Sequence, residues 1–586
     1  MKEKIDLSAL FKSDEDAKKE LISLKKYAKN ISNYEGKILS NPEMLYEYLE
    51  YDNEISKRLE RLYLYAHINN DLDLTNENYN EMLGNVLNFL NKLSEKESYV
   101  VPELLEKDFK FVKEYIKKFP KLKEYENNLK SIYRAKKYIK SKEEEKIITL
   151  LTSVYSKSED ASEMLLTTDM DFGTITDEEG KIVPLTISNF STYVRSNNQN
   201  VRKEAFLKLY KEIKHYENTF NTIYTTKVMS NNKVAKLRGF KSARSLSLYS
   251  NDIKNDIYDN LINGIKNNLP KFYKYYDLKK KVLGLDKLHL YDTYANITKD
   301  FDKKYTYDEA KKLVISSLEV MGNSYVEVIK KAFSDNWIDV YPKKNKRDGG
   351  YCTCAYLAHP YVVINYEGKL DDVSTLIHEL GHAMHYYYAQ NYNTYEDYNY
   401  SIFVAEVASQ VNEIILTNYM LNHTDNIEEK KYILDSILQR FKATMIRQTM
   451  FAHFEDNLHN KEMKGTVLKE LVQKEYLDLN KLYFGPNVEV DEDIKYECYR
   501  IPHFYYNFYV YQYATGYAAA LKIANDIINK KDGALENYIK FLKLGSTLDP
   551  VKSLKVAGVD IQSPSLYDEV FEFFDEKRKE LESLYE

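Results

Sequence analysis

Apolar residues recur every three or four positions along most of this chain, and this spacing constrains its fold more than any other feature. The pattern runs over residues 14–165, resumes over residues 188–334 and covers most of the chain after Gly368. Because an α-helix has 3.6 residues per turn, these stretches predict amphipathic helices. The 586 residues include only 18 glycines and 11 prolines, so helix breakers are few. We therefore expect a mainly α-helical protein.

Two short β-prone regions interrupt the helices. Residues 172–176 and 181–183 flank an acidic turn that contains Gly180, which predicts a hairpin. We expect this hairpin to end an N-terminal helical lobe of residues 1–190, followed by a second domain of residues 191–586. Segments at 337–341, 351–357 and 361–366 predict a small sheet directly before a long helix.

Charge and cysteine content restrict the partners and the compartment. The 84 basic and 90 acidic residues give a formal charge of −6, which offers nucleic acid no general attraction. No run of eighteen apolar residues could span a bilayer, and the first twenty residues lack the apolar core of a secretory signal. The three cysteines, an odd and sparse set, fit a reducing compartment. We expect a soluble, cytoplasmic protein without nucleic-acid or membrane partners; the sequence predicts no oligomeric state.

The helix expected from Asp371 or Asp372 carries the motif His378-Glu379-x-x-His382. Histidines four positions apart lie one turn apart, so both imidazoles can bind one metal ion. Glu379 lies about 100° around the helix, where its carboxylate can take a proton from a metal-activated water. Chance would produce this pattern in such a chain only about 1 to 2 times in a hundred. Two imidazoles, a carboxylate and an open position form the typical catalytic zinc set.

A third ligand must come from outside this helical turn. His385 lies nearly two turns from His378, and we expect it to be buried in the core or to support a metal ligand through a hydrogen bond. Residues 403–420 predict an apolar helix with a polar stripe that includes Glu406 and Glu413. Glu406 is the favoured ligand, with Glu413 better placed to support the free N–H of a ligand histidine. Glu396 is a weaker candidate, because the preceding loop in which it lies would have to be ordered before its carboxylate could bind the metal.

Several segments resemble oligoendopeptidase F, in the thimet-oligopeptidase group of zinc metallopeptidases. They are GKLDDVSTLIHELGHAMH from Gly368, FVAEVASQVNE from Phe403 and IPHFYYNFYVYQYATG from Ile501, together with HPYVVINYEG, RQTMFAHFE, DMDFGTI and VAGVDIQSPS. The resemblance covers most of residues 165–570. It implies a two-lobed helical shell around a deep channel, one zinc ion per chain, and cleavage of short peptides. By motif, it implies zinc ligands His378, His382 and Glu406, with Glu379 as general base, in a catalytic domain of residues 191–586.

The resemblance also implies that a histidine and tyrosines near the C-terminus stabilise the tetrahedral intermediate. The matching stretch offers His503, Tyr506, Tyr509 and Tyr513, and we favour His503, Tyr506 and Tyr513. Tyr506, Tyr509, Tyr513 and Tyr517 recur at three or four positions, which predicts one shared helix face, whereas Phe508 and Tyr511 suit packing. An aromatic stripe also fits a core, and the chain contains 55 tyrosines.

The predicted sheet suggests how a substrate could bind. If residues 353–357 form an exposed edge, a peptide could add as a further strand beside the metal, and Gly349 and Gly350 would let its backbone approach closely; an ordinary turn explains the glycines equally well. Cys352 and Cys354 could bind metal or oxidise, but packing is the favoured role.

The resulting hypothesis is zinc-dependent hydrolysis of oligopeptides by an activated water, with Glu379 as the base. Two alternatives stay open at this point. One is an inactive homologue that only binds peptides, and the other is a helical zinc carboxypeptidase that trims single C-terminal residues.

Overall fold

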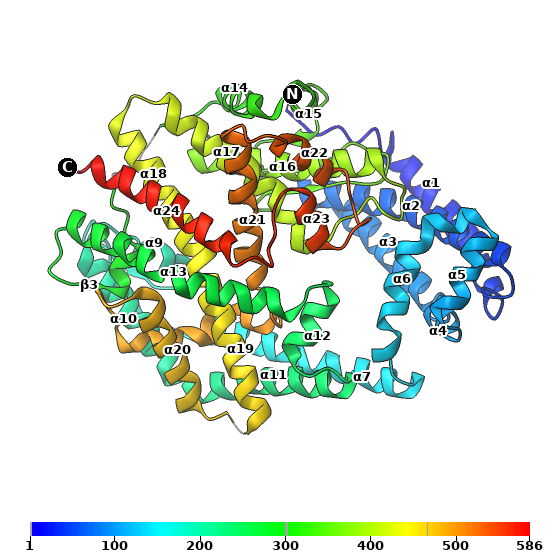
Figure 1. Cartoon of the computed structure of the whole chain (residues 1–586), viewed down its shortest axis with the longest axis horizontal. Coiled ribbons are helices and arrows are strands. Elements are labelled where there is room, and N and C mark those ends of the chain that lie inside the picture. Colours follow the sequence, from blue (N-terminus) through cyan, green and yellow to red (C-terminus); the bar gives the residue numbers. More distant parts are fainter. Residues whose placement is uncertain (1–2, 299–302, 466) are drawn as a thin grey trace. The chain divides into compact units, whose positions relative to one another are not determined.

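The computed structural model describes residues 3–298, 303–465 and 467–586 and is mainly α-helical, as the spacing of apolar residues predicts (Figure 1). The chain divides into two compact units, each made of three separate stretches. Unit 1 comprises Met1–Lys137, Asp302–Tyr419 and Ile523–Gly558, and unit 2 comprises Tyr138–Phe301, Met420–Lys522 and Val559–Glu586. This division follows contacts between residues and not chain order, so the boundary expected at residue 190 stays a prediction.

Unit 1 contains the N-terminal helices and the helices that surround the small sheet. They are α1 (Asp14–Tyr27), α2 (Pro42–Leu72), α3 (Glu77–Lys96), α4 (Val100–Leu105), α5 (Phe109–Lys118), α6 (Glu126–Ala135), α14 (Tyr307–Ser317), α15 (Asn323–Ser334), α16 (Leu370–Tyr392), most of α17 (Ile402–His423), α22 (Ala534–Leu542) and α23 (Pro550–Val556). The longest, α2, begins where Pro42 takes the first helical position and the Asn41 side chain accepts the N–H of Met44 at 2.8 Å. Both features favour a helix start.

One apolar core joins the N-terminal helices to the sheet. Ile55 and Leu62 of α2 and Val86 of α3 are buried in the same cluster as Tyr361 and Val363, which lie on the central strand of the sheet. Burial of an apolar side chain of this size contributes about 1.5–3 kcal/mol. The helices expected from the sequence therefore support the sheet that lies beside α16.

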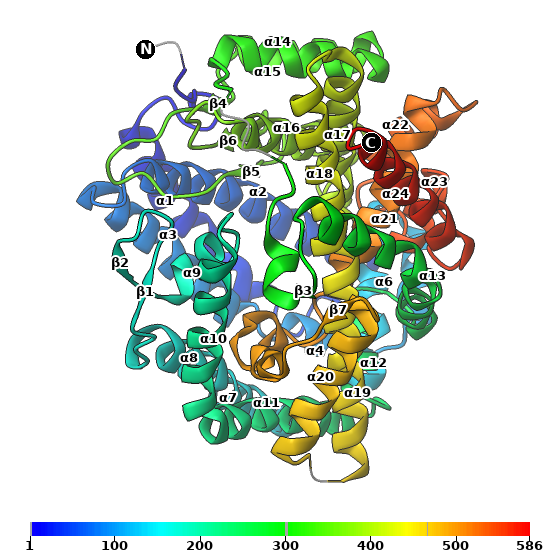
Figure 2. The ribbon, with the colours of Figure 1, turned by 90° about the vertical axis from the view of Figure 1, so that its left-hand side faces the viewer.

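The small sheet is confirmed, but its edge strand is shorter than predicted. Strands β4 (Ile338–Asp339), β6 (Tyr361–Val363) and β5 (Tyr351–Thr353) lie in the order β4-β6-β5, with β6 parallel to β4 and antiparallel to β5. Figure 2 shows the sheet next to α16. Residues 354–357 do not extend β5, because the chain turns there and Leu357 adopts a left-handed φ of 64°.

Unit 2 contains the remaining helices and the predicted hairpin. Strands β1 (Thr174–Thr176) and β2 (Ile182–Pro184) pair antiparallel, as the sequence indicates, and β3 (Leu288–His289) pairs parallel to β7 (Val488–Glu489). Its helices are α7 (Lys142–Tyr155), α8 (Lys157–Met164), α9 (Ile187–Tyr193), α10 (Gln199–His215), α11 (Glu217–Arg238), α12 (Ala243–Ser250), α13 (Asn255–Val282), α18 (Ile427–Phe441), α19 (Gln448–Lys464), α20 (Lys469–Phe484), most of α21 (Tyr511–Ile528) and α24 (Ser565–Ser583). Helices α13 and α24 pack together (Figure 1).

A buried ionic cluster in unit 2 anchors the segment that leads to His503. Glu497, fully buried, accepts hydrogen bonds from Arg447 at 3.1 Å, Tyr476 at 2.7 Å and Tyr210 at 3.1 Å, and also from Arg500. Burial alone would raise the pKa of this carboxyl, but the two guanidinium charges and the hydrogen bonds outweigh it and lower the pKa to about 2. Glu497 belongs to the 3₁₀ helix Glu492–Arg500, which this cluster fixes in place.

Among the described residues, no helix combines the length and the apolar character needed to cross a membrane.

Candidate metal centre

The helix that carries the HExxH motif is fixed at its start and along one face. The Asp372 carboxylate accepts the backbone N–H groups of Lys369 at 2.8 Å and Glu367 at 2.9 Å, which stabilises the first turn of α16. The predicted apolar face is buried and comprises Val373, Leu376, Ile377, Leu380 and Met384. Burial of this face directs His378 and His382 along a neighbouring stripe.

Gly381, between the two histidines, sets how closely α17 approaches α16. A Cβ atom at this position would lie 2.5 Å from the Cα of Ser409 and 2.7 Å from the carbonyl oxygen of Ala408. Both are backbone atoms of α17, and a side chain cannot occupy that space. Glycine therefore permits a backbone-to-backbone crossing of the two helices at the height of the motif.

The crossing brings three candidate ligands together. One ligand atom each from His378, His382 and Glu406 lies within 4.8 Å of the other two. The Oε2 atom of Glu406 is 3.4 Å from Nε2 of His378 and 3.8 Å from Nε2 of His382. All three side chains are partly exposed, so the group can be reached from solvent.

The second nitrogen of His378 has its own partner. Its Nδ1 lies 2.5 Å from Oε1 of Glu413, one helical turn beyond Ser409 on α17. A carboxylate at this nitrogen fixes the ring and leaves Nε2 for a metal ion. Burial, with a smaller contribution from His378, lowers the pKa of His382 to about 3, although a hydrogen bond with the backbone of Ala405 opposes the shift. His382 is therefore in the neutral form that binds metals.

The geometry of these groups fits zinc. Two imidazole nitrogens and one carboxylate oxygen are the ligand types of catalytic zinc sites. Ligand atoms about 2.0–2.1 Å from a tetrahedral ion are about 3.3–3.4 Å apart, close to the observed separations of 3.4 and 3.8 Å. For the two pairs that include Glu406, binding of a zinc ion would thus need only small movements of the side chains.

Glu379 lies beside the ligands in a nearly water-free environment. Its side chain is 6% exposed, and burial raises the pKa of its carboxyl to about 7; the charge of His378 opposes this shift and that of Glu406 adds to it. A carboxyl with a pKa near 7 can accept and release a proton at neutral pH. A divalent cation on the neighbouring ligands would favour its ionised form.

The other candidates considered from the sequence lie outside this group. His385 is buried and stacks on the Tyr400 ring at 3.6 Å between centroids, while its Nδ1 finds no hydrogen-bond partner in the part of the chain that the structure describes. This is the environment of a core histidine. Glu396 accepts a hydrogen bond from Asn128 at 2.6 Å.

The edge strand β5 lies against α16, and the glycines before it act differently from one another. A Cβ atom on Gly350 would meet Cγ2 of Thr375 at 3.1 Å, so this residue makes room for α16. Gly349 has a φ of +87° and open space around it, which is a turn conformation. All three cysteines are free. Burial raises the pKa of both Cys352 and Cys354, as expected for packing residues.

The aromatic candidates form a cluster in unit 2, but not on one helix face as predicted. The chain forms a 3₁₀ helix at Pro502–Tyr505, turns at residues 506–508 and starts α21 only at Tyr511. The His503 ring lies 5.5 Å from that of Tyr506 and 5.9 Å from that of Tyr513, between centroids. Tyr517 is instead buried against Phe441.

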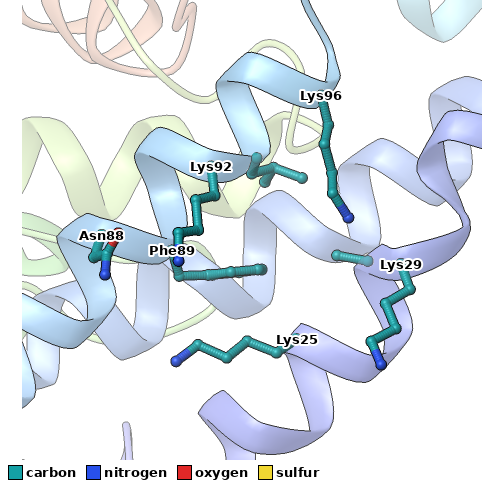
Figure 3. A pocket seen from close by; sticks show the side chains of 8 residues that line it. Lys25, Lys29, Asn88, Phe89, Lys92 and Lys96 are labelled. Carbon is teal, nitrogen blue, oxygen red and sulfur yellow. The ribbon is translucent and has the colours of Figure 1, made fainter.

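A basic pocket in unit 1 lies apart from the metal-ligand group. Figure 3 shows Lys25 of α1, Lys29 of the following 3₁₀ helix Ala28–Tyr34, and Lys92 and Lys96 of α3 around the Phe89 ring. The pocket has a volume of about 250 Å³ and is lined by Lys25, Ala28, Lys29, Asn88, Phe89, Lys92, Leu93 and Lys96. None of the residues predicted to act in chemistry belongs to it.

Gly381 was not singled out from the sequence, although a signal was present. A glycine inside a strongly helical pattern lowers helix stability by about 1 kcal/mol and usually has a packing reason. The sequence contains no indication of which segment approaches it.

Comparisons with known proteins cover nearly the whole chain. Residues 192–573 match the family model "Peptidase family M3", and residues 103–172 match "Oligopeptidase F". Oligopeptidase PepF of Bacillus subtilis (strain 168) is 39% identical over 99% of this chain and 86% of its own length. An oligoendopeptidase F homolog of Borreliella burgdorferi is 37% identical over 100% of this chain and 98% of its own. The crystal structure of oligoendopeptidase-F from Enterococcus faecium superposes with a TM-score of 0.75 at 31% identity, covering 98% of this chain and 99% of that one.

Proposed function

Because this chain belongs to Peptidase family M3, a family of zinc metallopeptidases, we propose that it hydrolyses short oligopeptides with one zinc ion held by His378, His382 and Glu406. It is a metalloendopeptidase of the oligoendopeptidase F type. The observation that carries the proposal is the approach of the three ligand atoms to within 4.8 Å where α16 crosses α17.

A zinc ion bound there would polarise the scissile carbonyl and lower the pKa of a water molecule to about 7. Glu379 is the general base: its carboxylate takes the proton of the attacking water and passes it to the nitrogen of the leaving amine. Its burial supports this role, because a pKa of about 7 suits both acceptance and release of the proton.

Glu413 orients one of the ligands. Its carboxylate accepts a hydrogen bond from the Nδ1–H of His378, so that Nε2 carries the lone pair and lies on the side of Glu406. This assignment separates the two glutamates of α17 by function: Glu406 binds the ion directly, and Glu413 acts through the imidazole.

The substrate backbone would align along β5. This strand is an edge of its sheet and packs on α16, so an extended peptide could continue the sheet next to the metal ligands. Short peptides are the proposed substrates, as the resemblance to oligoendopeptidase F implies and as the names of the relatives support.

We assign to three residues the stabilisation of the negative charge that develops on the carbonyl oxygen: His503, Tyr506 and Tyr513. Their rings form one cluster in unit 2, and both phenol and imidazole groups can donate hydrogen bonds to negative charge. Loss of one well-placed donor of this kind costs about 2.7–4 kcal/mol of transition-state stabilisation.

The free cysteines support a cytoplasmic location.

The test of the base is Glu379→Gln, measured with an internally quenched fluorogenic peptide whose C-terminus is amidated. The variant should keep its zinc, because Glu379 is not a ligand, and kcat should fall by at least about 10²-fold. Wild-type turnover would contradict the assignment. Cleavage of the amidated peptide by the wild type, mapped by mass spectrometry, separates an endopeptidase from a carboxypeptidase, and zinc binding without any cleavage would identify an inactive homologue.

A further inference from the structure

The turn between His503 and α21 has a backbone conformation that its residues rarely adopt alone. Asn507 and Phe508 both have left-handed φ angles, 53° and 59°. Asparagine tolerates this region, but a bulky residue such as phenylalanine is disfavoured there. Such a conformation persists only where the surroundings impose it. The contacts of this turn therefore identify the groups that stabilise its conformation.

Three elements of unit 2 hold the turn. Glu455 on α19 accepts the backbone N–H of Phe508 through Oε1 at 2.7 Å. Ser247 on α12 donates its hydroxyl to the carbonyl oxygen of Asn507 at 2.7 Å. The Phe508 ring is fully buried, 4.8 Å from the ring of His459 on α19 and 5.9 Å from that of Tyr258 on α13.

This turn determines which aromatic rings meet. His503 and Tyr506 precede it, and Tyr509 and Tyr513 follow it. After the reversal, the Tyr509 ring lies 6.2 Å from that of Tyr506 and 5.4 Å from that of Tyr513. The Tyr513 hydroxyl lies 3.5 Å from Nε2 of His503. In a continuous helix Tyr513 would lie ten residues, about 15 Å, along the axis from His503, so the contact between Tyr513 and His503 depends on the reversal.

A carboxyl group is energetically unfavourable at the position of Glu455, because burial removes it from water. It is fully buried, and its Oε2 has no hydrogen-bond partner within residues 3–298, 303–465 and 467–586. Burial raises the pKa of its carboxyl to about 8, Asp456 adds to the shift, and the Phe508 N–H and Lys227 oppose it. An apolar side chain would avoid this desolvation but could not accept the Phe508 N–H. Glu455 thus provides a hydrogen-bond acceptor for the Phe508 N–H, which an apolar residue would lack.

We propose that Glu455 is a positioning residue for peptide hydrolysis: by accepting the Phe508 N–H it holds the left-handed turn that places Tyr506 and Tyr513 beside His503. This inference rests on the function proposed for these three residues. Glu455 is fully buried and acts through the turn, by way of its hydrogen bond with the Phe508 N–H.

The experiment compares two substitutions in the full-length zinc enzyme. Glu455→Leu replaces the side chain with an apolar one of similar volume and removes the hydrogen-bond acceptor. Glu455→Gln keeps an oxygen for the Phe508 N–H and places its NH₂ where Oε2 already lacks a partner. Thr449→Val is the matched control, because Thr449 is buried on the same helix and its hydroxyl has no hydrogen-bond partner among the described residues.

Glu455→Leu should lower kcat about tenfold or more with little change in KM, since the cluster acts in the transition state. The affinity for a phosphinic peptide, a tetrahedral mimic, should fall by the same factor, and the affinity for a product peptide should not change. Glu455→Gln and Thr449→Val should stay within about threefold of the wild type in kcat.

With Glu455→Leu, either of two results would overturn the inference. One is wild-type kcat in Glu455→Leu. The other is a loss confined to the fraction of active enzyme, measured by active-site titration, with unchanged phosphinate affinity, because that pattern reflects stability alone. If Glu455→Leu does not fold, Ser247→Ala weakens the same turn from its other side; it should lower kcat in the same way, and an unchanged kcat there overturns the inference.

The proposed function is tested separately by His503→Ala, Tyr506→Phe and Tyr513→Phe. If none of them lowers kcat, the oxyanion assignment fails and the inference fails with it. If they lower kcat and Glu455→Leu does not, only the positioning role is wrong. If Glu455 acts through the turn, the double variant Glu455→Leu/Tyr506→Phe should lose no more than the larger single loss, whereas additive losses would contradict this route.

Discussion

Alanine at position 381 tests whether the helix crossing builds the metal site. The added Cβ would lie 2.5 Å from the Cα of Ser409, whereas carbon atoms in contact normally lie about 3.5–4.0 Å apart. The nearest atoms are backbone, so α16 and α17 must separate by about 1 Å. Glu406 lies on α17, three residues before Ser409, and it moves with that helix.

The change should affect metal binding much more than folding. Overpacking of a helix contact destabilises a protein by about 1–3 kcal/mol. Alanine stabilises a helix by about 0.8–1 kcal/mol relative to glycine, so Gly381→Ala should lower the free energy of unfolding by only about 0–2 kcal/mol. Metal sites tolerate errors of only about 0.2 Å in ligand distance. Displacement of Glu406 by about 1 Å should therefore weaken zinc binding at least about tenfold.

The assay is zinc affinity by competition with a chromogenic chelator, combined with urea unfolding of the metal-free protein. Gly84→Ala is the control: Gly84 is an exposed residue inside α3 with open space around its Cβ position, so this variant should gain about 1 kcal/mol and bind zinc normally. If folded Gly381→Ala binds zinc as tightly as the wild type, the crossing does not position Glu406 and the reasoning is refuted.

Two further substitutions test the surroundings of the site and the core of unit 2. Glu413→Ala removes the partner of His378 Nδ1 and should weaken zinc binding by about 10–100-fold while unfolding in urea changes little; equal affinity would exclude the orienting role. Glu497→Gln leaves Arg447 and Arg500 without a counter-charge and should lose about 3–5 kcal/mol in urea unfolding at pH 7, and a loss below about 1 kcal/mol would contradict the ionic role. Because the folded pKa of Glu497 is lowered from the ordinary 4.5 to about 2, its stabilisation is present above pH 4.5 and is lost as the pH falls through 2; the variant should lack this acid-dependent loss.

The motif on α16 could be predicted because its geometry is local. Two histidines four positions apart meet on any regular helix, and the apolar face of α16 fixes which way they point. The sequence favoured Glu406 over Glu413 as the ligand, and the resemblance supported that choice, but local helix geometry alone does not separate the two. They are seven residues apart and share one stripe of α17, so helical periodicity treats them alike. The contact between Gly381 and Ser409 distinguishes them, because it places Glu406 on one side of the crossing and Glu413 on the other.

The C-terminal cluster shows the opposite case, in which a regular pattern was misleading. Tyrosines at 506, 509, 513 and 517 have helical spacing, yet a turn at Asn507 and Phe508 divides them. Phe508 gives no local sign of a left-handed conformation, and the acceptor that stabilises it, Glu455, lies on another helix more than fifty residues earlier. Gly381 and Glu455 have one property in common: each is unfavourable in its own surroundings, a glycine within a helix and an acid within a core. Such unfavourable residues mark where tertiary contacts override local preference, and here both occur at contacts that place the groups proposed for catalysis.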